Sequence, residues 1–423
     1  MKRIIYHVDV NSAFLSWEAT YRIHHLGGKL DLRTIPSAVG GDQEKRHGII
    51  LAKSIPAKKY RIQTGEPVVD AKRKCPELVL VLPNYELYNK ASKALIRLLQ
   101  EYTDKIEQYS IDEAFMDMTG CTDNPEQTAK ELKDRVRERL GFTVNVGISE
   151  NKLLAKMASD FQKPDLVHTL WKEEIPKKMW PLPVGDLFYV GHASKRKLQS
   201  IGIRTIGDLA QTDEKILKAH LKSHGLLIRQ YANGFDPSGV VTSPPPNKGY
   251  GNSLTTPRDV CDADTAKLFL LSLAETVSAR LRADNAKVGV VSVSIRDWNL
   301  QFSGHQTTLA TPTDLTMEIH AAACRLFDEL WDKTPIRHLG IHTSRVSYDT
   351  FRQIGIFDAV DYEKQKKLET AVDALRKRYG QDVVMRASFL ESPSDKGKFW
   401  IDHMGGGISR DRRTVDYSRE KIQ

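Results

Sequence analysis

Two segments that lie far apart in the chain both lead from apolar residues into carboxylates. The first, residues 4–8, is rich in β-branched and aromatic side chains and runs directly into Asp9. The second, residues 109–118, has the pattern of a hairpin turn that enters a half-buried strand, with Asp112 and Glu113 at the turn. We therefore expect a sheet in which two strands bring three carboxylates together. Such a group needs a cation, because like charges repel.

This acidic group favours phosphoryl-transfer chemistry, although simpler interpretations stay open. Mg²⁺ prefers hard oxygen ligands and is usually bound through one or two carboxylates and substrate phosphates. Carboxylates that bridge two such ions, about 3.5–4 Å apart, serve in-line phosphoryl transfer. Taken alone, however, Asp112 and Glu113 are typical of a solvated turn, and Asp9 is also a suitable N-cap for the helix that follows it.

The distribution of charge indicates where a polyanionic partner could bind. The 423 residues are enough for two to four domains, and 40% hydrophobic residues are typical of a soluble globular protein. The net charge is +9, and the excess is concentrated in residues 20–77, with 12 basic and 6 acidic side chains, and in residues 171–240, with 11 and 7. Residues 241–348 hold 11 of each. A nucleic acid should therefore bind mainly to the first two regions.

Cysteine usage and hydropathy bound the compartment. The four cysteines are far apart and show no zinc or CxxC spacing, so we expect free, buried thiols in a reducing compartment. No apolar run approaches the ~20 residues needed to cross a bilayer, and Asp9 interrupts any signal-peptide core. We expect a cytoplasmic protein with no membrane association.

The amino-terminal half predicts an α+β sheet domain that is interrupted early by an inserted basic module. Within the module, a short strand and a Pro-started helix at 48–60 would place Lys53, Lys58 and Lys59 near one another. They could meet a triphosphate there or form a solvated basic helix face. Further elements are expected as a helix at 87–107, a helix at 125–140, a strand at 142–148 and a helix from 153 that ends at Lys163–Pro164.

The carboxyl-terminal half begins with a helical region at 171–236. Its residues 190–203 predict two helices joined by a tight glycine turn, which either binds phosphate through backbone N–H groups or is a plain packed hairpin. A Pro- and Gly-rich linker follows at 237–252. A second α+β pattern then predicts helices at 264–284 and 315–332, strands at 288–296 and 338–346, a charged helix at 361–379, and a poorly ordered tail from about Ser392.

Four motifs in this order resemble those of the Y-family DNA polymerases, the translesion class. They are HVDVNSAF at 7–14, SIDEAFMDM at 110–118, GISENKLLAKMASDFQKP at 147–164 and NSLTTPRDV at 252–260. The resemblance extends from Tyr6 to about Val346 and implies an α+β right-hand polymerase fold. The implied domains are a palm (1–19 and 78–170), fingers (20–77), a helical thumb with a helix-hairpin-helix motif (171–240), a linker (241–250), a little finger (251–348) and a tail (349–423).

The resemblance also assigns roles to individual residues. Asp9, Asp112 and Glu113 are implied to be catalytic and, with the Val10 carbonyl, to bind two Mg²⁺ ions. Phe14 matches the steric gate that excludes a 2′-hydroxyl, and Lys163 matches a lysine that contacts the dNTP. The other implied substrate-binding residues are Asn11, Ser12, Ala13 and Lys58, and the implied DNA-binding residues are Gly191, Lys195, Gly202 and Arg258.

One further motif implies a protein partner. Residues 353–357, QIGIF, resemble the peptide by which bacterial polymerases bind the sliding clamp, through Gln353, Ile354, Ile356 and Phe357. The alternative is a final strand of the preceding domain. The implied partners are thus primer–template DNA, dNTP and the clamp, for a monomeric enzyme.

Three departures from the family pattern are visible. Asn11 stands where many members have a second aspartate, and Tyr189 replaces the first glycine of the helix-hairpin-helix turn. Ile55 and Lys58 stand where the family usually has Tyr and Arg, so the hydroxyl and the planar guanidinium fork are lost. Two rival hypotheses are a non-catalytic DNA- and clamp-binding descendant, which would be expected to lose a carboxylate, and a metal-dependent nuclease.

Overall fold

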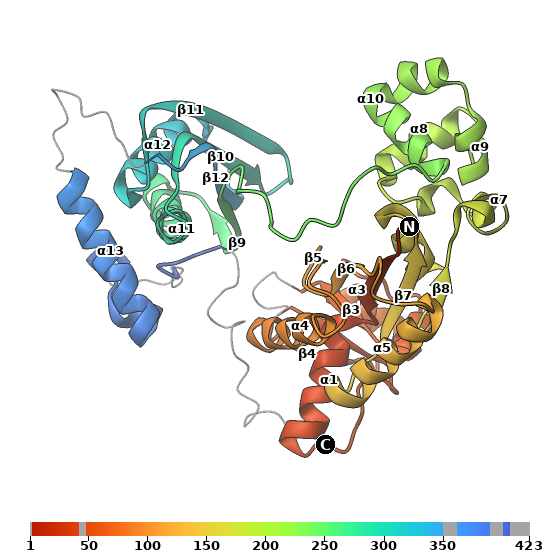
Figure 1. Ribbon diagram of the computed structural model, residues 1–423. Coiled ribbons are helices and arrows are strands. Elements are labelled where there is room, and N and C mark those ends of the chain that lie inside the picture. The colour runs from red at the N-terminus through yellow and green to blue at the C-terminus, as the bar shows by residue number, and fades with distance from the viewer. Residues whose placement is uncertain (1, 42–47, 350–361, 390–400, 407–423) are drawn as a thin grey trace. The chain divides into compact units, whose positions relative to one another are not determined.

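The computed structural model describes residues 2–41, 48–349, 362–389 and 401–406. The chain divides into two units, built mainly from Met1–Gly40 with Ile49–Pro244 and from Pro245–Arg413. The first unit holds a five-stranded and a three-stranded sheet, and the second holds a four-stranded sheet (Figure 1).

The five-stranded sheet has the order β5-β6-β1-β7-β8, with β1 antiparallel to both β6 and β7. Its strands are β1 (Ile5–Val10), β5 (Ile106–Gln108), β6 (Glu113–Asp117), β7 (Val144–Ser149) and β8 (Val167–Thr169). The helices that accompany it are α1 (Ala13–Leu26), α4 (Tyr85–Leu99), α5 (Pro125–Leu140) and α6 (Lys152–Asp160). Because β1 is central and covered on both faces, all six of its residues are buried.

Successive side chains of β1 point to opposite faces of the sheet, so only every second one lies in the main hydrophobic core. Tyr6, Val8 and Val10 face the main hydrophobic core, which α1, α4 and α5 complete. Ile5, on the opposite face, packs instead against Ala155 of α6. Gly147 on β7 allows this close approach of α6, since an added Cβ would lie 2.0 Å from the Ala155 carbonyl oxygen. His7 and Asp9 therefore point toward α6.

The inserted basic module forms a small sheet of its own, with the order β3-β2-β4. Its elements are β2 (Ser37–Gly40), β3 (Ile50–Lys53), α2 (Ile55–Lys59), α3 (Val68–Lys74) and β4 (Val79–Val81). A separate core that includes Ile50, Ile62 and Val68 holds the module together.

The helical region of the first unit shares a core with α6, which contributes Leu153, Leu154 and Met157. Its helices are α7 (Ile175–Lys178), α8 (His192–Ser200), α9 (Ile206–Gln211) and α10 (Glu214–Ala232). Thr205 and Asp208 cap the start of α9 reciprocally, as a capping box.

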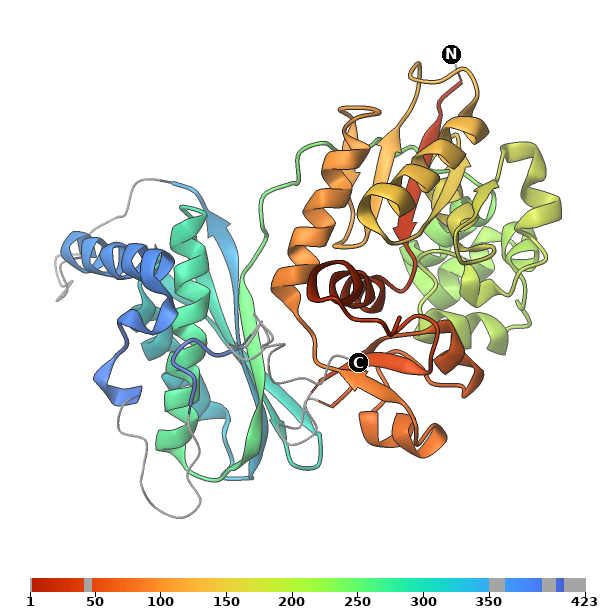
Figure 2. The ribbon, with the colours of Figure 1, turned by 90° about the horizontal axis from the view of Figure 1, so that it is seen from below.

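The second unit is a sheet of order β11-β10-β12-β9, with helices on one face. Its elements are β9 (Gly251–Val260), α11 (Ala263–Ala283), β10 (Lys287–Asp297), β11 (Phe302–Thr313), α12 (Thr316–Leu330), β12 (Ile336–Ser347) and α13 (Tyr362–Tyr379). α11 and α12 bury Leu270 and Phe327 against Val293 and Ile341 of the sheet. Within this unit, α13 lies on the far side of α11 from the sheet (Figure 2).

Several expected elements differ from the structure. The helix expected at 87–107 ends at Leu99, because Ile106 pairs with Met116 and so joins the sheet. β9 and β11 were not predicted. The tail expected to be poorly ordered includes residues 401–406, where Ile401 packs into the core of the second unit. Residues 353–357 lie outside the described residues.

Two compositional expectations can be compared with the structure. All four cysteines belong to the described residues and are free thiols: Cys75, Cys121, Cys261 and Cys324. Cys75 is buried as expected, but Cys121 and Cys261 are exposed, so the expected burial is wrong for these two. None of the described helices is both long enough and apolar enough to cross a membrane.

Candidate active site

β1 and β6 pair in a register that places Asp9 directly opposite Glu113. Directly opposite residues share one face of a sheet, so both carboxylates lie on the face that α6 covers. Asp112 is the residue before β6, and its carbonyl oxygen accepts a hydrogen bond from the Val10 N–H at 3.1 Å. The fold therefore brings the three carboxylates to one end of this strand pair, as the sequence predicted.

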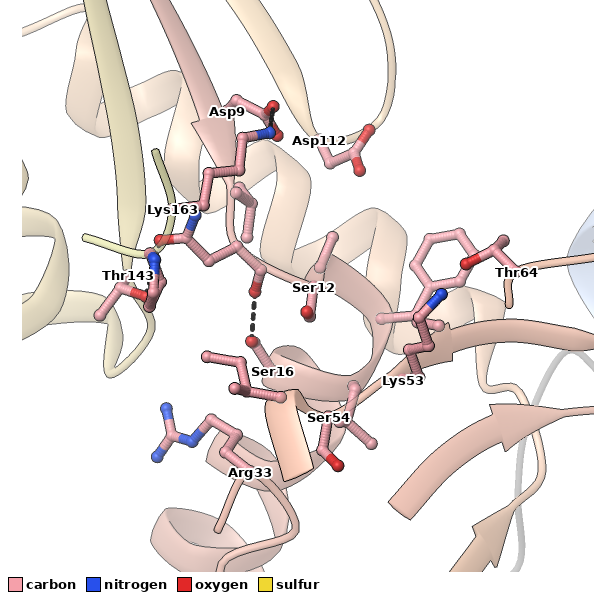
Figure 3. A pocket seen from close by; sticks show the side chains of 18 of the residues that line it. Asp9, Ser12, Ser16, Arg33, Lys53, Ser54, Thr64, Asp112, Thr143 and Lys163 are labelled. Carbon is pink, nitrogen blue, oxygen red and sulfur yellow. Dashed lines mark hydrogen bonds and ion pairs between the residues drawn. The ribbon is translucent and has the colours of Figure 1, made fainter. Parts of the chain in front are cut away.

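Two lysines supply positive charge to two of these carboxylates. Lys156 of α6 places Nζ 2.9 Å from Glu113 Oε1 and 3.8 Å from Asp9 Oδ2. Lys163, just beyond α6, donates to Asp9 Oδ2 at 2.5 Å (Figure 3). Burial opposes the charge of Lys163, but Asp9 and Asp160 outweigh burial and raise its pKa.

Asp112 has no such partner. Its Oδ1 accepts a hydrogen bond from Ser110 Oγ at 2.7 Å, and no Lys, Arg or His of the described chain forms an ion pair with it. Burial raises the pKa of Asp112, and the negative charges of Asp9 and Glu113 raise it further. A carboxylate in this environment is stabilised by an added cation.

The pKa of Glu113 is shifted in the opposite direction to that of Asp112. Burial alone would raise its pKa, but His7 and Lys156 outweigh burial and lower the pKa to about 2. His7 is fully buried, with Nδ1 2.7 Å from Ser159 Oγ and Nε2 3.5 Å from Glu113 Oε2. Glu113 is therefore ionised at neutral pH.

The donor set fits a divalent cation with oxygen ligands. Among the described residues, no three His, Cys, Asp or Glu side chains lie close enough together to hold a metal ion as they stand. Asp9 and Glu113 are turned toward Lys163 and Lys156 instead. The three carboxylates and Val10 nevertheless line the same cavity, and hard oxygen ligands are those that Mg²⁺ prefers.

A cavity of about 740 Å³ opens at this acidic end (Figure 3). All ten residues that the sequence implied as metal or substrate ligands line it: Asp9, Val10, Asn11, Ser12, Ala13, Phe14, Lys58, Asp112, Glu113 and Lys163. Other lining residues were missed, among them Arg33, Thr64 and Thr143. The sequence around Arg33 did not indicate that this residue lines the cavity. Its side chain is positioned by an ion pair with Asp31 at 2.8 Å and by a hydrogen bond that it donates to the distant Gly141 carbonyl oxygen.

One wall of the cavity is the start of α1. Ser12 adopts a left-handed conformation (φ 50°) before the helix begins at Ala13. The first N–H groups of a helix have no intrahelical partner, so they can donate hydrogen bonds to phosphate oxygens. Phe14 is held in place by the Tyr88 ring, with centroids 4.5 Å apart and planes within 10°.

The facing wall is basic. Ser54 caps α2 by accepting a hydrogen bond from the Ala57 N–H at 3.1 Å, and Lys53 and Lys58 flank this turn and line the cavity. Burial lowers the pKa of Lys53, and the positive charge of Lys58 lowers it further. Ile55 also lines the cavity and is 46% exposed. Lys59 is not among the lining residues.

Asn11 belongs to the internal structure of the sheet. Its Nδ2 donates to Asn145 Oδ1 at 3.1 Å, and its Oδ1 accepts from Thr143 Oγ1 at 3.0 Å and the Asp165 N–H at 2.9 Å. An aspartate here would lose the donor toward Asn145. The geometry therefore favours a structural role for the Asn11 side chain over the substrate-binding role that was expected.

The expected DNA-binding residues do not line the cavity. Gly191 precedes α8, and an added Cβ there would meet nothing within 4 Å, so its backbone is open. Gly202 turns the chain after α8 with φ 87°, and Lys195 lies on α8 itself. Tyr189 adopts a left-handed conformation (φ 73°), which a glycine would favour. Arg258 lies on β9 of the second unit.

Comparison with known proteins identifies the family. Residues 8–160 match the model of the impB/mucB/samB family, and residues 247–356 match that of the family's C-terminal domain. The chain is 44% identical over 393 residues to DNA polymerase IV of Clostridium acetobutylicum, covering 92% of this chain and 99% of the relative. It is 35% identical to DNA polymerase IV 1 of Bacillus subtilis, covering 94% and 95%.

The chain belongs to the Y family of DNA polymerases. A solved structure of a Y-family DNA polymerase chimera matches it with a TM-score of 0.70 and 21% sequence identity, over 82% of this chain and 100% of the chimera. The likeness extends the family assignment to the fold, as the motifs predicted. Y-family polymerases depend on metal ions, which agrees with the oxygen-rich end of the β1–β6 pair.

Proposed function

We propose that this Y-family member is a template-directed DNA polymerase that adds deoxynucleotides to a primer opposite damaged template bases. The observation that carries the proposal is the meeting of three carboxylates, a helix N-terminus and a basic wall in one cavity. The primer 3′-hydroxyl loses its proton to solvent, and its O3′ bonds to the α-phosphorus of the dNTP. The bond from that phosphorus to the bridging oxygen of the β-phosphate breaks, and pyrophosphate leaves.

Asp9, Asp112, Glu113 and the Val10 carbonyl are the proposed ligands of two Mg²⁺ ions. When bound, such ions make a better nucleophile of the primer hydroxyl and neutralise charge on the phosphates. The chain's own contribution is to hold the ligands on two paired strands, whose register keeps Asp9 and Glu113 side by side. Asp112 would gain most, since it lacks a cationic partner among the described residues.

The triphosphate is proposed to lie between α1 and α2. Backbone N–H groups from Ser12 to Phe14 would donate hydrogen bonds to phosphate oxygens, and Lys58 and Lys163 would approach as point charges. Lys163 would then exchange Asp9 for phosphate, which a single flexible ammonium can do. Lys53, beside Lys58, adds a third positive charge.

Phe14 is proposed to set sugar selectivity, because its ring is wedged against Tyr88 at the cavity wall. Removing the ring should open space at C2′, so Phe14→Ala should incorporate ribonucleotides while keeping much of its dNTP activity. A purely structural role predicts something else: a loss of ~3–5 kcal/mol in stability and equally poor use of both sugars.

The domain roles are also proposed, from the motifs that resemble those of the family. We assign the palm to 1–19 and 78–170, the fingers to 20–77, the thumb to 171–240, the linker to 241–250 and the little finger to 251–348. In the thumb, the open backbone around Gly191 and Gly202, with Lys195, is proposed to bind DNA phosphates without reading sequence. Arg258 is proposed to do the same from the little finger.

The tail is proposed to tether the enzyme to a sliding clamp through residues 353–357. Burying Ile356 and Phe357 would stabilise the complex by roughly 1.5–3 kcal/mol each. Ile356→Ala with Phe357→Ala should thus weaken clamp binding by at least ~100-fold and leave clamp-free extension of a short primer unchanged. Equal loss of clamp-free extension would point to a structural role. A monomeric enzyme in the bacterial cytoplasm completes the proposal.

Primer extension by the purified protein tests the proposed function. The substrates are plain and abasic templates, with dNTPs and with or without Mg²⁺. We expect Mg²⁺-dependent extension on both templates. A non-catalytic DNA-binding descendant would bind the primer–template and never extend it, and a nuclease would shorten the primer instead. Either result would refute the proposal.

A further inference from the structure

Asp160, the last residue of α6, shares two lysines with the proposed metal ligands. Its Oδ1 lies 2.8 Å from Lys163 Nζ, and its Oδ2 lies 3.6 Å from Lys156 Nζ. The same two ammonium groups bond Asp9 at 2.5 Å and Glu113 at 2.9 Å. Two lysines therefore lie between three carboxylates.

The position of Asp160 is unfavourable for the helix itself. The last turn of a helix carries a partial negative charge, so cations are preferred there and a carboxylate is disfavoured. α6 nevertheless ends on Asp160 and has no basic residue in its last turn. The ion pairs with Lys156 and Lys163, which lie outside that turn, offset this effect. The carboxylate therefore serves the two lysines and not the helix.

Asp160 differs from the proposed metal ligands in its exposure. Its side chain is 47% exposed, against 8% for Asp9 and 20% for Glu113. It also does not line the cavity that Asp9, Asp112 and Glu113 share. Asp160 is thus near enough to hold the lysines but lies outside the proposed ligand set.

The two lysines hold carboxylate oxygens that a divalent cation would need. Asp9 Oδ2 and Glu113 Oε1 each accept a hydrogen bond from an ammonium group, and like charges at such a place repel. The side chain of Lys156 is only 10% exposed, so loss of its partner would leave a buried charge unpaired. A lysine stem is flexible, and Asp160 already lies near both Nζ atoms.

We propose that Asp160 is the counterion that receives Lys156 and Lys163 when Asp9 and Glu113 bind a divalent cation. Lys163 keeps its bond to Asp160 as it leaves Asp9, and Lys156 turns from Glu113 toward Asp160. Both ammonium groups therefore stay paired in both states. Asp160 is a positioning residue, because it acts only through the two lysines. This inference rests on the proposed metal-binding role of Asp9 and Glu113.

The test measures the binding of Mn²⁺ alone, without DNA or nucleotide, to the full-length chain. Mn²⁺ takes the oxygen ligands that also suit Mg²⁺, and electron paramagnetic resonance reports the free ion. Asp160→Asn should weaken Mn²⁺ binding at least ~3-fold, because both lysines then stay on Asp9 and Glu113. Asp160→Glu restores the carboxylate and should bind like the unchanged chain. Glu150→Gln, just before α6, removes a carboxylate paired with Lys2; it is the matched charge control and should change binding little.

A double-mutant cycle separates this exchange from simple long-range attraction. Lys156→Met with Lys163→Met removes the competing ammonium groups and should tighten Mn²⁺ binding at least ~3-fold. Adding Asp160→Asn to that background should then have no further effect. If Asp160→Asn weakened binding equally in both backgrounds, or no more than Glu150→Gln does, the proposal would be wrong. Should the lysine variant not fold, the comparison of Asp160→Asn with Asp160→Glu and Glu150→Gln still decides.

Asp112→Asn separates a failure of this inference from a failure of the proposed function. Loss of Mn²⁺ binding in the Asp112 variant, together with unchanged binding by Asp160→Asn, would reject only the role of Asp160. Unchanged Mn²⁺ binding by Asp112→Asn would reject the proposed ligand set, and this inference with it.

Discussion

Two clusters of buried charge in this molecule differ in whether their charges are balanced locally. In the second unit, Glu275 and Glu369 are met by Arg376, Arg282 and Arg386, so each buried carboxylate has a guanidinium partner. In the first unit, Asp112 has no cationic partner among the described residues, and its neighbours carry its own sign. The balanced cluster holds α13 on its unit, whereas the unbalanced carboxylate would be stabilised by a bound cation.

The identity of the cations sharpens this difference. Arginine presents a planar fork that stays charged and pairs with carboxylates at two points, which suits a permanent joint. Lysine is a point charge on a flexible stem, and both cations at the β1–β6 end, Lys156 and Lys163, are lysines. Lysines can exchange one anion for another, so these ion pairs could rearrange if an anionic substrate binds at the proposed site.

The largest effect is expected from Asp112→Asn. Primer extension should fall on the order of 10⁴-fold, as for loss of a catalytic carboxylate, while primer–template affinity stays unchanged because phosphate contacts come from other elements. Burial raises the pKa of Asp112, so ionising it disfavours the folded state above both pKa values. The variant should therefore be at least as stable as the unchanged chain at neutral pH.

Single-turnover extension, anisotropy and urea unfolding measure these three quantities. Asp123→Asn, at an exposed carboxylate away from the cavity, is the matched control and should behave like the unchanged chain. Extension by the Asp112 variant at more than about a tenth of the normal rate would show that the unbalanced carboxylate is not needed, against the catalytic contribution expected of such a group.

The balanced cluster predicts a loss of stability instead. Arg376→Met leaves buried Glu275 with Arg386 as its remaining partner, so the loss should cost about 1–3 kcal/mol in urea unfolding of the second unit. Arg73→Met removes an exposed pair with Asp70 and should change stability little. If the two variants were equally stable, the buried ion pairs would not hold α13 in place. The proposed difference between this balanced cluster and the carboxylates of the first unit would then be wrong.

A smaller and pH-dependent effect is expected from Lys156→Met. His7 and Lys156 outweigh burial and lower the pKa of Glu113 from 4.5 to about 2, so its ionised form stabilises the fold above pH 4.5. That stabilisation is lost as the pH falls from 4.5 toward 2. Without Lys156 the pKa of Glu113 should rise and this acid-dependent loss should shrink. Urea unfolding across that range checks it, with Lys90→Met, at an exposed pair with Glu86, as the control. If the acid dependence of stability were unchanged, His7 and not Lys156 would be the main cause of the lowered pKa of Glu113.

The parts of the site that sequence predicted are those that one strand or turn carries by itself. Asp9, Asp112 and Glu113 stand out because each ends an apolar run or sits at a turn. Lys163 was implied as a dNTP contact, but the ion pairs of Lys156 and Lys163 with the carboxylates could not be predicted, because they depend on the packing of α6 on Gly147. The network around Asn11 was hidden for the same reason, since it joins residues from three separate segments.

The strands missed in the second unit have a shared cause. β9 and β11 are the two edges of the sheet, and both contain proline and many polar residues. Proline is tolerated in an edge strand, because the N–H groups on its outer side pair with no neighbour. The central strands β10 and β12 were predicted within one or two residues of their ends, and β10 carries a nearly continuous apolar run.

The central claim is that the three carboxylates at the β1–β6 end, of which Asp112 lacks a cationic partner among the described residues, bind Mg²⁺ together with a nucleotide. The most direct test is the shift in thermal midpoint of the purified chain when Mg²⁺ and a non-reacting dNTP analogue are added together. The unchanged chain and Asp123→Asn should both gain stability, since a ligand that binds only the folded state raises the midpoint. Asp112→Asn should gain little or nothing. An equal gain in the Asp112 variant would contradict the account.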